Sequence, residues 1–155
     1  MKKEIVSMEK QAVKKTEEAL AEIYRNAQLA LQSISDILPA VEDERIKEEL
    51  SRQHESYEHF SAQASILARD NGIELKDPNP MKKMMMWGSI KMSTLTDNSP
   101  SHIAEMMVQG TVMGITALKC TLGDVPVEGN EKVIALLEEM LKAEEEFEKI
   151  WKEYL

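Results

Sequence analysis

The chain has 155 residues, of which 43% are hydrophobic and 30% charged, and its formal net charge is −9. This length fits one domain, residues 1–155, and six glycines and five prolines suit long helices better than a sheet with many turns. The acidic balance argues against a nucleic acid or an anionic membrane as a partner, because both attract basic surfaces.

A cytoplasmic location is expected. Cys120 is the single cysteine and cannot form an internal disulfide, which favours a reducing compartment. The lysines near the N-terminus are not followed by an apolar run, so they do not indicate a signal peptide. No uncharged apolar run is long enough to span a bilayer.

Apolar residues at steps of three and four predict a first helix over residues 4–38. Its apolar stripe, expected to face the core, runs from Ile5 to Ile37. The stripe is weakest near Lys14, so the first turns are expected to fray or to form a separate piece. Pro39 ends the helix, because proline disfavours a helical conformation in the residue before it.

The same period predicts a second helix over residues 43–70, which Asn71-Gly72 would end. The third helical unit is expected to be broken near Thr96–Ser99, between a short helix over 81–95 and a longer one over 100–121. Ser99 is expected to be the N-cap of the longer helix, with Pro100 in its first position.

The helix over residues 100–121 is apolar on two opposite sides, so we expect both sides to be covered. One side carries Ile103, Met107, Gly110, Gly114 and Ala117. The other carries Val108, Val112 and Ile115, which we expect to form a homodimer interface. Met84, Met85 and Met86 are consecutive and cannot share one face of a helix, so Met85 is added to that interface.

A last helix is predicted over residues 130–154, where Glu144 occupies a core position of a near-heptad apolar pattern. Four long helical units with short connections predict an all-α, up-down four-helix bundle. A buried carboxylate is unfavourable without a partner. His54, Gln53 or Tyr24 could pair with Glu144, or a local bulge could let it reach water.

A bundle of this kind invites a di-metal carboxylate site, which needs Glu-x-x-His on two helices. The residues three positions before His54, His59 and His102 are all serines, so that motif is absent. A single transition-metal ion held by His54, Glu58 and Glu144 is an alternative, because the first two lie near the edge of the buried stripe of their helix. No cofactor is expected otherwise.

Eleven methionines, most of them between residues 81 and 113, are read first as core side chains. They leave two alternatives open: an adaptable surface for an apolar ligand or peptide, and soft ligands for Cu(I). No catalytic residue is assigned, since no histidine lies near Cys120 in the sequence and capping explains Ser99 and Ser101.

The run Thr96-Asp97-Asn98-Ser99-Pro100-Ser101, followed by Ile103-Ala104-Glu105-Met106 and by Gly110-Thr111-Val112-Met113-Gly114, resembles a group of bacterial proteins of the ferritin-like helical-bundle class. The resemblance covers most of the chain and implies a fold, but no particular activity. The expected function is that of a non-catalytic interaction or structural protein. Metal binding and the binding of an apolar ligand or peptide are the alternatives.

Overall fold

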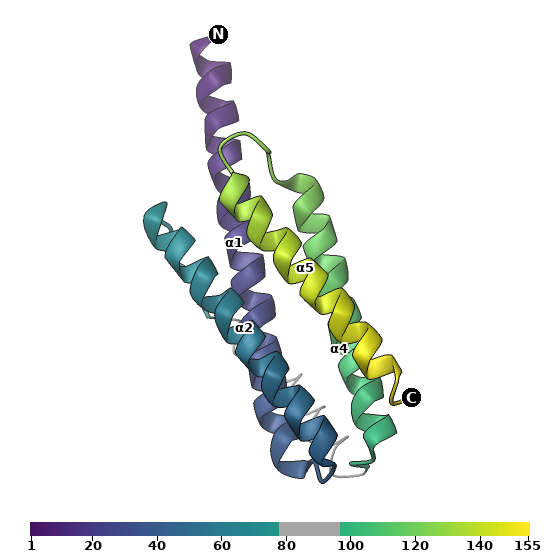
Figure 1. Cartoon of the computed structure of the whole chain (residues 1–155). Coiled ribbons are helices and arrows are strands. Elements are labelled where there is room, and N and C mark those ends of the chain that lie inside the picture. The colour runs from purple at the N-terminus through teal and green to yellow at the C-terminus, as the bar shows by residue number, and fades with distance from the viewer. Residues whose placement is uncertain (78–96) are drawn as a thin grey trace.

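The computed structural model describes residues 1–77 and 97–155, which form four α-helices and no strand (Figure 1). The elements are α1 (Lys2–Ile37), the 3₁₀ turn η1 (Leu38–Ala40), α2 (Glu44–Asp70), α4 (Pro100–Asp124) and α5 (Glu131–Lys152). The predicted all-α class is therefore confirmed for these residues. The short helix expected over 81–95 lies outside the described residues.

None of the helices in the described part of the chain is long and apolar enough to cross a membrane.

Local sequence signals set the ends of the helices. Asp43 caps α2, since its side chain accepts a hydrogen bond of 3.0 Å from the backbone N–H of Ile46. Ser99 caps α4 through a bond of 3.3 Å from the N–H of His102, and Pro100 occupies the first turn. The cap at Ser99 agrees with the prediction. Gly72 follows α2 with a φ of +67°, a value that a residue without a Cβ adopts readily.

The helices pack as two pairs. α1 packs most extensively against α2, and α4 against α5, with further contacts between the pairs. We call these packed parts of the four helices the helical body. Its fully buried large side chains come from every helix and include Leu20, Ile23, Ile34, Ile46, Leu50, Ile103, Leu118, Leu137, Met140 and Trp151.

The first part of α1 extends beyond the other helices (Figure 1). Residues 1–10 are all exposed, and buried side chains begin only at Ala19. We call residues 1–15 the arm. The prediction that the apolar stripe faces the core is wrong for this part of α1, because Ile5 and Met8 are 51% and 68% exposed. The expected separate piece is also absent from this region, because α1 is one continuous helix from Lys2.

The buried side of α4 differs from the predicted one. Ile103 and Met107 are buried as expected, but the stripe continues through Thr111 and Ile115 to Leu118, while Gly110 is exposed. Because α4 is apolar on two sides, its period did not define which side is buried. Thr111 fits the interior since its hydroxyl donates to the carbonyl oxygen of Met107 at 2.6 Å.

Candidate functional site

Glu144 lies on the buried side of α5 and is fully enclosed, as its core position predicted. Its carboxyl group faces Tyr57 of α2, Asn26 of α1 and the backbone of Gly114 of α4. Each of the four helices thus contributes one residue to this polar group, which we call the Glu144 centre. The amide of Asn26 also donates to the carbonyl oxygen of Gly114 at 3.4 Å.

The carboxyl group of Glu144 has little to stabilise a negative charge. Neither of its oxygens makes a hydrogen bond of ordinary geometry within the described part of the chain. Burial raises the pKa of Glu144 to about 8, although the nearby Tyr57 hydroxyl and Asn26 amide lower it. Burial, and then the neighbouring Glu144, raise the pKa of Tyr57 well above its ordinary value. The centre therefore favours the neutral forms of both side chains near pH 7.

Gly114 makes room for this arrangement. A Cβ at position 114 would overlap Oε2 of Glu144 and would lie 3.0 Å from both polar atoms of the Asn26 amide. The Glu144 carboxyl thus rests directly on the backbone of α4. Gly110, predicted to lie on the same side of this helix as Gly114, is exposed, and a Cβ there would meet nothing within 4 Å.

The residues proposed as metal ligands are placed differently from one another. His54 and Glu58 pair on α2, with Nδ1 and Oε1 2.6 Å apart, and their side chains are 33% and 60% exposed. Glu144 faces Tyr57 and Asn26 instead. Across residues 1–77 and 97–155, no group of three or more His, Cys, Asp or Glu side chains could hold a metal ion. The single metal ion stays an untested alternative, and the expectation of no other cofactor is likewise untested.

The partners suggested for Glu144 are engaged elsewhere. Gln53 is fully buried and accepts a hydrogen bond of 3.0 Å from the indole N–H of Trp151. The amide of Gln53 donates to Glu49 at 2.8 Å. The hydroxyl of Tyr24 donates to Asp77 at 3.2 Å. No sequence pattern pointed to Asn26, which meets Gly114 and Glu144 only because α1, α4 and α5 pack together.

The proposed interface residues of α4 do not share one exposed face. Val112 is 40% exposed, but Val108 packs partly against the core and Ile115 is buried. Met113, next to Val112, is 71% exposed. Met85 lies outside the described residues. Of the predicted interface residues in α4, Val112 is the one that is exposed. Whether two chains associate through it stays a prediction.

The arm exposes more apolar surface. Ile5, Val6, Met8 and Val13 are 51%, 49%, 68% and 59% exposed, and they lie within nine residues of one helix. Single exposed apolar side chains are common on soluble proteins, but a contiguous group of large ones often marks a surface that binds a partner.

The base of the arm is anchored to the helical body. The hydroxyl of Thr16 donates to the side-chain oxygen of Asn130 at 2.8 Å, and Lys15 lies 3.9 Å from Asp124. A hollow of about 260 Å³ lies here, between Ala12, Val13 and Thr16 of α1 and residues 71, 73, 129 and 130. We call it the base hollow.

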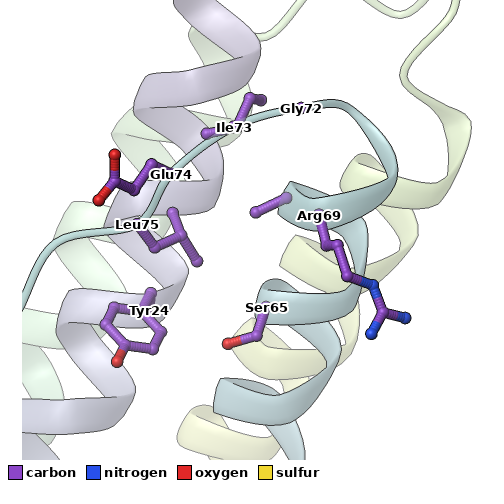
Figure 2. A pocket seen from close by; sticks show the side chains of 8 residues that line it. Tyr24, Ser65, Arg69, Gly72, Ile73, Glu74 and Leu75 are labelled. Atoms are coloured by element: carbon purple, nitrogen blue, oxygen red, sulfur yellow. The ribbon is translucent and has the colours of Figure 1, made fainter.

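A second hollow, of about 480 Å³, lies between α1 and the end of α2, beneath residues 72–75, which follow α2 (Figure 2). Tyr24, Ser65 and Leu75 line it, while the charged ends of Arg69 and Glu74 point away on opposite sides (Figure 2). The hydroxyl of Ser65 already donates to the carbonyl oxygen of Ser61 at 2.9 Å. The polar groups around this second hollow therefore do not converge on one point. A site that recognises a ligand needs such convergence.

No protein-family model matches the chain, and no curated protein or solved structure is similar enough to be counted as a relative. The resemblance to the ferritin-like class therefore stays a prediction.

Proposed function

We propose that this chain is a non-catalytic, ferritin-like helical-bundle protein that acts by binding another protein chain, and that the arm of α1 is its binding element. The observation that carries the proposal is the exposed apolar stripe formed by Ile5, Val6, Met8 and Val13. It is a broad stripe with two rows, because Ile5 and Met8 are three residues apart and Val6 and Val13 are seven apart, so each pair lies along one line of the helix. A helix that presents such a stripe is a common recognition element, because its apolar side can enter a groove or pack on another helix.

The helical state of the arm supports this role. The arm continues α1 outward without burying the side chains of residues 1–10. Helices of this length gain most of their stability from packing of an apolar side, so an unpacked arm is only marginally stable. A partner that covers the stripe would stabilise the arm and bury apolar surface at the same time.

The outer face of α4 is the alternative binding surface, but it offers less. Only Val112 and Met113 are large exposed apolar residues there, and they are neighbours in sequence. Neighbours on a helix point about 100° apart, so the two side chains cannot form one stripe along α4.

Two methionines of nearly equal exposure allow a matched test, since Met8 of the arm is 68% exposed and Met113 of α4 is 71% exposed. A photoreactive amino acid is placed at position 8 or 113, and cells producing each variant are illuminated. We expect position 8 to give a discrete adduct with a protein chain, and Ile5→Glu to abolish it. Adducts from position 113 alone would move the binding element to α4, and no adduct from either position would refute the interaction role.

A further inference from the structure

We infer that the partner of the arm is the arm of a second copy of this chain, packed antiparallel, so that the outer end of each arm reaches the base of the other. This inference rests on the proposed function, since it names the partner of the same surface. The outer end is defined by Lys2 and Lys3. The base is defined by Asp124, which lies 3.9 Å from Lys15, and by Glu128, which directly precedes Gly129 of the base hollow.

The apolar stripe fits a copy of itself. Ile5 lies toward the outer end, Met8 in the middle, and Ala12 and Val13 near the base. In an antiparallel pair, Ile5 of one arm packs against Ala12 and Val13 of the other, and the two Met8 side chains meet near the middle. Two identical stripes then cover each other around a two-fold axis, which is the commonest symmetry of soluble oligomers.

Charge favours the antiparallel arrangement. The arm carries five lysines and two glutamates, a net charge of +3, whereas the complete chain carries −9. Lys2 and Lys3 lie at the outer end, while Asp124 and Glu128 are exposed at the base. A parallel pair would set the lysines of both outer ends side by side, and like charges in contact are unfavourable. An antiparallel pair sets Lys2 and Lys3 of each chain near Lys14 and Lys15 of the other, but also near Asp124 and Glu128, so that acidic residues offset lysines at both ends.

The geometry of the base also fits. The arm from Lys2 to Lys15 is about 20 Å long at 1.5 Å per residue. Its full overlap with a second arm brings Ile5 of one chain close to the base hollow of the other. Val13 lines that hollow and Val127, 73% exposed, lies on the same loop as Glu128. The apolar end of the partner arm would cover both valines.

The expected complex is reversible. Two helices of about four turns bury less than the roughly 1,200 Å² of a standard specific interface. We therefore expect a dimer that dissociates on dilution. Added salt should weaken it further, because the lysines and the acidic residues at the contact are exposed to solvent.

A charge swap tests the arrangement in the full chain. One variant carries Lys2→Glu and Lys3→Glu, and the other carries Asp124→Lys and Glu128→Lys. Each variant alone would bring like charges together twice, so we expect its self-association to be at least about tenfold weaker than that of the unchanged chain. An equimolar mixture would restore opposite charges at both ends. Sedimentation velocity should then show a species of twice the 17.6 kDa chain mass.

Val112→Glu is the control, and it should leave the dimer intact. Three results would overturn the inference: an unchanged chain that stays monomeric at high concentration, a mixture that stays monomeric, or a dimer lost through Val112→Glu. If the chain is monomeric but position 8 still forms an adduct with a protein of another mass, the second copy is excluded while the interaction role stands. If neither a dimer nor an adduct is found, both proposals fail.

Discussion

The arm and the Glu144 centre depart from the usual distribution of side chains in opposite directions. The arm leaves Ile5 and Met8 largely exposed to water, whereas the helical body encloses the carboxyl group of Glu144 completely. Folded proteins normally bury apolar side chains and leave unpaired carboxylates outside. Both departures lie on long, regular helices, so neither results from a local irregularity of the backbone.

The two departures affect different equilibria. Exposed apolar residues change the folding free energy of a single chain very little, and they matter when a second surface can cover them. A buried carboxyl group acts on folding itself, because removing it from water opposes its ionisation. The arm is therefore the region that we propose to act in association, whereas the Glu144 centre is expected to make the unfolding free energy depend on pH.

The largest expected effect is that of Glu144→Gln above pH 8. The pKa of Glu144 is about 8 in the folded chain and near 4.5 without burial. The unfolded chain thus releases this proton first, and the stabilisation from the protonated folded form is lost as pH rises from about 4.5 to 8. Glutamine cannot ionise, so the variant should gain up to about 5 kcal/mol over the unchanged chain at pH 9.

Denaturant unfolding of both proteins from pH 4.5 to 9 measures this gain. The difference between their unfolding free energies should grow through that range and then level off, and Glu138→Gln, at an exposed position of α5, should show no such trend. A difference that stays constant with pH would mean that the Glu144 carboxyl ionises as freely in the folded chain as in the unfolded one.

A pair of isoleucines in α1 tests the comparison within one helix. Ile23 is fully buried and Ile5 is 51% exposed, although both follow the same apolar period. Ile23→Ala should lower the unfolding free energy by about 2–5 kcal/mol, since it removes buried methyl groups and leaves a cavity. Ile5→Ala should change it by less than about 0.5 kcal/mol in dilute solution. Equal losses from the two variants would mean that the arm is packed within a single chain.

The sequence was sufficient for features that depend on neighbouring residues. It predicted four of the helices with the approximate positions of their ends, the cap at Ser99, and the core position of Glu144. These signals act within one or two turns, through backbone hydrogen bonds and the 3.6-residue period.

Features that depend on distant elements were missed for a physical reason. The period of α1 predicts an apolar stripe that includes Ile5, but it does not say whether another helix reaches that far. The two apolar sides of α4 left its orientation undefined, and the buried Thr111 was overlooked. Asn26 had no local signal, because its neighbours Gly114 and Glu144 belong to helices far along the chain.

The smallest of the three effects concerns Gln53, a buried polar residue that, unlike Glu144, has partners. Its side chain accepts from the Trp151 indole and donates to Glu49. Gln53→Met would leave the indole N–H buried and unpaired, so we expect a loss of about 1–3 kcal/mol in unfolding free energy, independent of pH. Adding Trp151→Phe should recover part of that loss, since the unpaired donor is then gone. Gln63→Met, at a half-buried position of α2, is the matched control and should change little. If Gln53→Met were harmless, the hydrogen bond to Trp151 would contribute nothing, and buried polar groups with and without partners would behave alike in this core.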